Sequence, residues 1–223
     1  MKTKYSLRLF LTSELLLYFL ILVTVFFPSA CSPLCGSVLR YISVLLCPSL
    51  GFFFYLSDRN PFSQKLLLAL TVSCAADYIL IFTRAYTAGV LLFCTVQLFY
   101  RQALFSSDTG VLKPTLPPFV PLFLLPADYV FPDRLLLPAA GLYLLLSLAN
   151  QKTAFRKHSK RLYSASESLR PDRQRCLSRG LFLLLLCDIH VGLSWLFPHI
   201  SLFSSGIWLF YQPSLVLVVS AML

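Results

Sequence analysis

Two aspartates lie inside long apolar stretches of the chain, where a charged side chain is unexpected. Asp77 falls within Ser73–Leu80, and Asp188 falls within Leu185–Gly192. A carboxylate in hydrocarbon costs several kcal/mol unless it is neutral, paired or next to a wet cavity. Both residues are therefore candidates for proton transfer or for stabilising a cation. A structural ion pair or a hydrogen bond between helices would also account for them.

The two aspartates are expected at a similar depth in a membrane. The stretches that hold them, 66–83 and 180–197, both run from the inner to the outer side in the topology derived below. Asp77 lies about 11 residues and Asp188 about 8 residues past the inner end, at depths of roughly 16 and 12 Å. We therefore expect both carboxyl groups to face one interior cavity, within about 10 Å of each other.

A tyrosine follows each aspartate at the same separation along the chain. Tyr100 follows Asp77, and Tyr211 follows Asp188. In each pair the aspartate lies on an outward stretch and the tyrosine on the stretch that returns. This spacing indicates a parallel internal repeat of a helix pair. Coincidence is the alternative, because 15% of the residues are aromatic.

Other polar residues fall inside the apolar stretches and are candidates for supporting or substrate-binding roles. Arg40 could neutralise one of the aspartates. Gln97 and Gln212 could form hydrogen bonds between helices or contact a substrate. His190 lies two residues after Asp188, about 200° around a helix, so we expect it to be a packed, hydrogen-bonded histidine instead.

Composition requires lipid as the solvent for these residues. Of the 223 residues, 57% are hydrophobic and only 13% are charged, about half of what a soluble domain carries. We therefore predict an all-α fold, a single transmembrane domain over 1–223 with about eight membrane-spanning helices. The expected helices are Leu7–Phe27, Leu34–Leu56, Leu66–Thr83, Tyr86–Phe105, Val111–Val130, Leu135–Ala149, Gly180–Phe197 and Leu202–Met222. The first is too long for the apolar core of a signal peptide, so we expect it to be retained.

Charge asymmetry orients the bundle. With both termini inside, inner segments carry sixteen of the nineteen Lys and Arg residues, and the outer loops carry only Arg84 and Arg134. Nine of these cations fall in an expected cytoplasmic loop over about 150–179, which could contact anionic lipid headgroups. This distribution argues against nucleic acid as a partner. Cys31 and Cys35 fall in one outer loop and could pair, while the other cysteines read as small apolar residues.

The residues around both aspartates resemble the YhhN family of membrane proteins. The resemblance rests on Asp77-Tyr78-Ile79-Leu80, Gly89, Phe93, Gln97, Tyr100, Gly180-Leu181-Phe182, Cys187-Asp188 and Tyr211-Gln212-Pro213-Ser214. These motifs cover four helices, while helix number and order agree over most of the chain. The chain departs from the family pattern at Ala76, where Gly is frequent, and at Gln97, where His is common. Glutamine forms hydrogen bonds but does not transfer protons near neutral pH.

The resemblance implies a lysoplasmalogenase, which hydrolyses the vinyl ether bond of a lysophospholipid-like substrate to a fatty aldehyde and a glycerophospho-alcohol. This chemistry needs an acid that protonates the alkene and a carboxylate that stabilises the resulting cation and activates water. Asp77 and Asp188 would supply these roles, because we expect them to be the only acids deep in the membrane. No metal or cofactor is implied, since three histidines, one of them in the basic loop, do not form a His₃ zinc site.

Another class of function fits the same polar residues. Two facing aspartates and a parallel repeat also suit a small-solute or proton carrier, or a non-enzymatic membrane protein. A hydrolase needs an amphipathic cavity for one lipid chain, whereas a carrier needs water access from both sides in turn. The expected location is the plasma membrane of a bacterium. The exact lipid, the aspartate that acts as the acid and the oligomeric state stay open.

Overall fold

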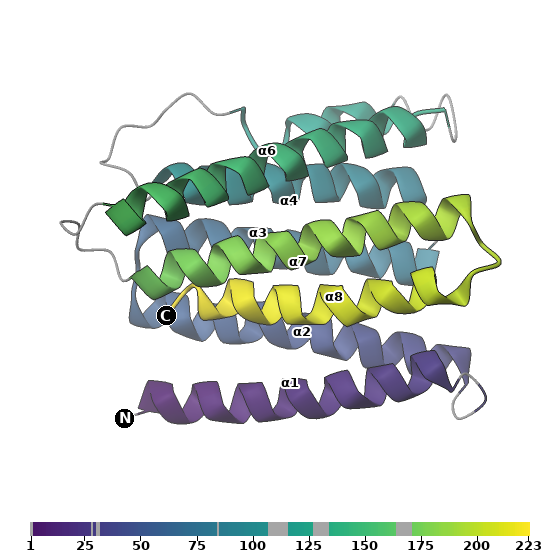
Figure 1. The fold of residues 1–223 in the computed structure, drawn as a ribbon, viewed down its shortest axis with the longest axis horizontal. Helices are drawn as coiled ribbons and strands as arrows, with labels where there is room; N and C mark the ends of the chain where they lie inside the picture. The colour runs from purple at the N-terminus through teal and green to yellow at the C-terminus, as the bar shows by residue number, and fades with distance from the viewer. Residues whose placement is uncertain are drawn as a thin grey trace.

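A computed structural model describes residues 2–27, 29, 32–83, 85–106, 116–126, 134–163 and 171–223. Within these ranges the chain forms seven α-helices and no strand, which confirms the all-α prediction (Figure 1). The helices are α1 (Lys2–Phe26), α2 (Pro33–Ser57), α3 (Pro61–Tyr78), α4 (Tyr86–Ser106), α6 (Leu136–Tyr163), α7 (Pro171–Leu196) and α8 (Ser201–Ser220). A π-helical turn, Ile79–Thr83, extends α3, and a 3₁₀ turn covers Val120–Leu124.

Local sequence explains where two of the helices begin. Ser32 precedes α2, and its hydroxyl accepts a hydrogen bond from the Cys35 N–H at 3.2 Å. Asn60 precedes α3 in the same way and accepts from the Ser63 N–H at 2.7 Å. A proline opens each of these helices, at a position where no backbone donor is lost.

Six of the helices are long and apolar enough to cross a membrane: α1, α2, α3 with its π-helical turn, α4, α7 from Arg173, and α8. Large apolar side chains stand on the outside of the bundle, as on Leu15, Phe19 and Leu202, which are each more than 60% exposed. Water cannot solvate such a surface at reasonable cost, whereas lipid can. The chain is therefore an integral membrane protein.

The basic segment is more helical than the sequence analysis predicted. We expected a loop over about 150–179, but α6 continues to Tyr163 and α7 begins at Pro171. The reason is that Ala, Lys, Arg and Gln, which dominate this segment, favour helix once the chain has left the hydrocarbon. The Lys157 ammonium donates to the Leu104 carbonyl near the end of α4, where a cation meets the negative end of the helix dipole.

The direction of α6 carries information on the number of crossings. Hydrogen bonds join Cys94 to Ala139, Gln97 to Asn150, and Leu104 to Lys157, so α4 and α6 run parallel. Ser106 and Leu136 therefore lie at opposite ends of the bundle. Of the expected helix Val111–Val130, residues 116–126 are described, and residues 111–115 and 127–130 lie outside the described residues. Its described part contains the 3₁₀ turn, and Phe119 packs on Phe99 of α4 with ring centroids 5.5 Å apart.

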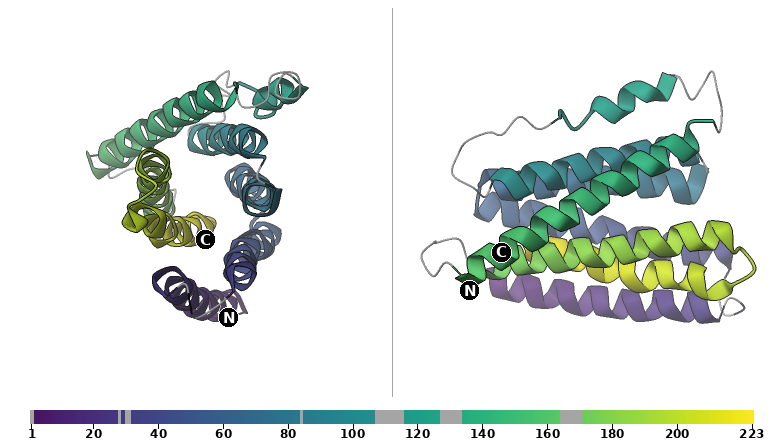
Figure 2. Two further views of the ribbon diagram at one scale, coloured as in Figure 1. Left: turned by 90° about the vertical axis from the view of Figure 1, so that its right-hand side faces the viewer. Right: turned by 45° about the horizontal axis from the view of Figure 1, so that its top comes forward.

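Two close contacts bind α8 to its neighbours. Pro213 has no N–H for the Leu209 carbonyl, and the Tyr18 hydroxyl of α1 donates to that carbonyl at 3.1 Å. On the other side, a Cβ on Gly206 would overlap the His190 imidazole of α7. His190 lies 2.9 Å from the Leu186 carbonyl, which confirms a packed, hydrogen-bonded histidine. End-on, α1 to α4 form an arc, and α6 and α7 lie across from it with α8 (Figure 2).

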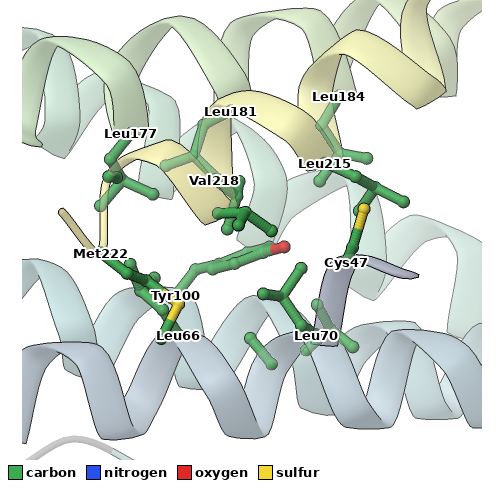
Figure 3. Packing of buried hydrophobic residues seen from close by; sticks show 14 of the residues in the cluster. Cys47, Leu66, Leu70, Tyr100, Leu177, Leu181, Leu184, Leu215, Val218 and Met222 are labelled. Carbon is green, nitrogen blue, oxygen red and sulfur yellow. The ribbon is translucent and has the colours of Figure 1, made fainter. Parts of the chain in front are cut away.

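Tyr100 is the centre of the apolar core. Its side chain is fully buried between helices that are distant in sequence (Figure 3). The residues around it come from α2, α3, α7 and α8: Cys47, Leu66, Leu70, Leu177, Leu181, Leu184, Leu215, Val218 and Met222. α4, which carries Tyr100, is thus enclosed on this face by four other helices.

Candidate functional site

Asp77 lies in the interior of the bundle, at the end of α3, and is 6% exposed. The Tyr211 hydroxyl of α8 donates to its carboxyl group at 2.5 Å. The π-helical turn Ile79–Thr83 begins two residues later, and such turns are frequent at functional sites in helices. Asp77 is therefore a buried carboxyl group whose orientation is set by a tyrosine from a helix far along the chain.

Asp188 is partly buried on α7 and is held by α6. The Tyr143 hydroxyl lies 2.8 and 2.9 Å from the two carboxyl oxygens, and the Ser147 hydroxyl lies 3.3 Å from one of them. Gln97 of α4 donates to Tyr143 at 3.3 Å. Asn150 in turn donates to the Gln97 side chain at 2.9 Å. One polar network therefore connects α4, α6 and α7 and ends on Asp188.

The two aspartates share polar neighbours. The Tyr100 hydroxyl interacts electrostatically with both carboxyl groups, and so does the Cys187 thiol. Although Ser73 lies beside it, the Tyr100 hydroxyl completes no hydrogen bond within the described residues. Asp77 and Asp188 therefore share Tyr100 and Cys187 as neighbours, and the Tyr100 hydroxyl is available to a further partner.

The hydrogen bonds of the two aspartates cross between the two helix pairs. Tyr211, the tyrosine of the second helix pair, donates to Asp77 of the first pair, as the expected proximity of a tyrosine requires. Asp188 takes its tyrosine from α6, outside both pairs. Helix packing, with α8 in contact with both α3 and α7, therefore decides which of these side chains meet.

Three site residues escaped the sequence analysis: Tyr143, Ser147 and Asn150. They are spaced by four and three positions and so occupy one face of α6. That spacing in an otherwise leucine-rich stretch is the signal that could have found them. Gln97 meets this face, so the hypothesis of a hydrogen bond between helices is confirmed for it.

A third buried acid corrects the expectation that Asp77 and Asp188 are the only ones deep in the membrane. Glu14 of α1 is 2% exposed, and the Ser43 hydroxyl of α2 donates to it at 2.7 Å. The Gln212 amide of α8 donates to both Glu14 and Ser43. Gln212 therefore belongs to a cluster at the junction of α1, α2 and α8, next in sequence to the tyrosine that holds Asp77.

Arg40 does not neutralise either aspartate. Among the described residues no carboxylate forms an ion pair with it, and its guanidinium lies over the Trp208 ring of α8, 5.2 Å from the centroid. The single ion pair of the described residues joins Arg173 and Asp58 at 2.7 Å, at the end of the bundle where α7 begins. The possible Cys31–Cys35 bond falls on Cys31, outside the described residues.

Replacing Glu14 with alanine should lower the free energy of unfolding by about 1–3 kcal/mol. Ser43 and Gln212 lose their shared acceptor and stay buried with only the hydrogen bond between them. Unfolding by a denaturing detergent, followed by circular dichroism, measures the change. Glu14→Gln is the matched control and should lose less, because the amide oxygen still accepts. Equal stability of Glu14→Ala and the wild type would show that the cluster contributes nothing to folding.

Comparison with known proteins identifies no counterpart for this arrangement. No family model matches the chain, and neither a curated protein nor a solved structure matches it. The resemblance to the YhhN family accordingly stays a hypothesis, and the case for a function rests on the side chains themselves.

Proposed function

We propose that this protein is a membrane-embedded lipid hydrolase of the lysoplasmalogenase type. The observation that carries the proposal is the pair of interior aspartates, each fixed by a tyrosine hydroxyl from another helix, with Tyr100 as a neighbour of both. A membrane protein has few reasons to retain ionisable groups in its interior other than chemistry, transport or structural pairing. Two carboxyl groups facing one region meet the requirement of a reaction that passes through a cation.

The reaction divides between the two carboxyl groups. One of them donates a proton to the alkene carbon remote from the ether oxygen, which forms an oxocarbenium ion. The other, ionised, stabilises this cation and takes a proton from water as the water oxygen bonds to the positive carbon. The hemiacetal then breaks its bond to the glycerol oxygen. That oxygen takes a proton from the second carboxyl group, and the hemiacetal hydroxyl gives its proton to the first, so a fatty aldehyde and a glycerophospho-alcohol leave and both carboxyl groups regain their starting states.

The tyrosines position the carboxyl groups in this scheme. Tyr211 and Tyr143 each donate to one aspartate and so restrict its rotation, which keeps the acid and the base in fixed places. Tyr100 has a hydroxyl with no hydrogen-bond partner among the described residues, beside both carboxyl groups. It is placed to bind the attacking water or the ether oxygen.

Aldehyde release tests the proposal directly. Full-length protein purified in detergent is incubated with a lysoplasmalogen, and free fatty aldehyde is trapped and quantified. We expect aldehyde in proportion to protein, and none from the saturated alkyl analogue, which has no alkene to protonate. Absence of aldehyde from the vinyl ether lipid would contradict the proposal.

A carrier of protons or small cations is the second candidate. Glu14 favours it, because a third interior carboxyl group lies at the α1–α2–α8 junction, separate from the hydrogen bonds of Asp188. The protein is reconstituted in vesicles that contain a pH dye, and a proton or cation gradient is imposed across their membrane. A carrier should then acidify the vesicle lumen, which the dye reports. This activity in the absence of aldehyde release would establish the carrier in place of the hydrolase.

The proposal includes an orientation in the plasma membrane of a bacterium. The chain crosses eight times, with α6 and the interval 107–135 as crossings, and both termini are cytoplasmic. The charge asymmetry supports this orientation, as does the parallel direction of α4 and α6. The N- and C-termini lie at the same end of the helix bundle in Figure 1, which an even number of crossings requires. The basic segment then faces anionic headgroups of the inner leaflet.

Reporter fusions should locate the two sides. Fusions that end after Gln174 are expected to read cytoplasmic, and fusions that end after Ser32 are expected to read external. The reason is that translocating the basic segment would carry nine cations across the membrane. Fluorescent protein and alkaline phosphatase fusions at the same sites give opposite signals and serve as mutual controls. An external signal at Gln174 would invert the orientation.

A further inference from the structure

Arg40 is a cation inside a membrane-spanning helix, and no carboxylate of the described residues forms an ion pair with it. It lies on α2, about two turns from the end that begins at Pro33. Its Nε atom is buried and has no hydrogen-bond partner among the described residues. A guanidinium in this position is costly unless an anion joins it.

The arginine is held against a column of rings that leads to Asp77. Its guanidinium lies 5.2 Å from the Trp208 ring centroid. Trp208 packs edge-on against Tyr211 at 5.6 Å, and Tyr211 donates to Asp77 at 2.5 Å. Trp208 and Tyr211 are one turn apart on α8, a rise of ~4.5 Å. Arg40 and Asp77 therefore lie along one wall of the interior. They are at nearly the same level, because Tyr41 packs on Tyr78 with ring centroids 5.7 Å apart.

We propose that Arg40, seated on Trp208, is the receptor for the phosphate group of a single-chain lipid. The planar fork of a guanidinium matches two phosphate oxygens at once, and stacking on an indole pre-orients it. In a lysoplasmalogen only the glycerol backbone separates the phosphate from the vinyl ether. A phosphate at Arg40 accordingly places the ether alongside Trp208 and Tyr211, on the side of Asp77. The choice of lysoplasmalogen as the lipid rests on the proposed function. The contact between Arg40 and the phosphate would make the site select a phospholipid.

Binding can be measured without turnover, because Trp208 is one of only two tryptophans. The other, Trp195, is 62% exposed, so Trp195→Phe leaves Trp208 as the sole fluorescent reporter. The full chain in detergent is titrated with an uncleavable alkyl-ether lysophospholipid, and separately with the alkylglycerol of the same chain length. We expect the phospholipid to change Trp208 emission and to bind at least ~10-fold more tightly than the alkylglycerol. Equal affinity of the two lipids would overturn the proposal.

Substitution of the arginine should remove this preference. In Arg40→Gln the phospholipid should bind at least ~10-fold more weakly, while the alkylglycerol is unaffected. Arg40→Lys keeps the charge without the fork and should fall between the two. Arg101→Gln is the matched control, since Arg101 also stacks on a ring, Phe105 at 5.6 Å, but belongs to the inner end of α4. A preference for the phospholipid that persists in Arg40→Gln would overturn the proposal. If the Arg40 variants fail to fold, the comparison of the two lipids on protein with Arg40 intact is the deciding test.

Two further measurements distinguish a lipid-phosphate site at Arg40 from a free-anion site and from a failure of the proposed hydrolase. Inorganic phosphate should displace the lipid only at far higher concentration, and displacement at equal concentration would assign the site to a free anion instead. Aldehyde release is measured on the same preparations with lysoplasmalogen. Arg40-dependent binding without aldehyde would leave the receptor intact and remove the hydrolase. Aldehyde release with no Arg40-dependent binding would support the hydrolase and overturn the assignment of Arg40 as the phosphate receptor.

Discussion

Asp77→Asn and Asp188→Asn should each lower the rate of aldehyde release from lysoplasmalogen by at least ~10²-fold. Protonation of the alkene and stabilisation of the cation contribute to one barrier, so the loss of either carboxyl group is sufficient. Asparagine retains the shape of aspartate but cannot donate an acidic proton or carry a negative charge. Single-turnover assays with purified variants give the rate, and the loss should appear in kcat rather than in KM.

Both variants should still fold, which makes the comparison clean. A neutral amide is easier to bury than a carboxylate, and its oxygen can accept the hydrogen bond from Tyr211 or Tyr143. Gel filtration and detergent unfolding should therefore resemble those of the wild type. Tyr143→Phe is an informative control, because it removes a donor to Asp188 and should cost less than losing the carboxyl group. Near-wild-type turnover in either asparagine variant would assign the aspartates to structure and favour the carrier.

Tyr100→Ala is expected to lower the free energy of unfolding by about 3–5 kcal/mol. The side chain is fully buried among four other helices, so truncation removes the contacts of a whole aromatic ring and leaves a cavity (Figure 3). The apolar residues around it belong to separate helices that cannot all move inward. Unfolding by a denaturing detergent, monitored by circular dichroism, measures the loss.

Tyr100→Phe distinguishes the contribution of the Tyr100 hydroxyl from that of its ring. Because that hydroxyl has no hydrogen-bond partner among the described residues, its removal should leave stability unchanged or slightly raised. If the hydroxyl binds water or the ether oxygen, the same variant will lose turnover without losing stability. A large loss of stability in Tyr100→Phe would contradict the assignment of a free hydroxyl.

The positions of the spans were predictable from the sequence because they depend on local composition. Leu7–Phe27, Leu34–Leu56 and Leu202–Met222, for example, correspond to α1, α2 and α8 within a few residues. An apolar stretch of about twenty residues has one inexpensive solution in a bilayer, a helix that satisfies its own backbone. The same reasoning singled out Asp77 and Asp188 as interior acids, since a charge in such a stretch must turn from lipid.

Reasoning from local pattern failed where charge and apolar residues mix. Glu14 lies within the first apolar stretch, Leu7–Phe27, and composition alone does not single it out as a deep acid. The basic part of α6 is predicted as a loop because its charges exclude it from hydrocarbon. Charge excludes a segment from lipid without preventing it from being helical, and α6 continues to Tyr163.

Only the tertiary structure decided which of these side chains are in contact. The spacing of Asp77, Tyr100, Asp188 and Tyr211 set their heights, but heights do not specify which side chains meet. Tyr211 reaches Asp77 because α8 packs against α3, and Arg40 meets Trp208 instead of a carboxylate because α8 also packs against α2. The rotation of each helix about its axis follows from packing against its neighbours, which a single sequence does not encode locally.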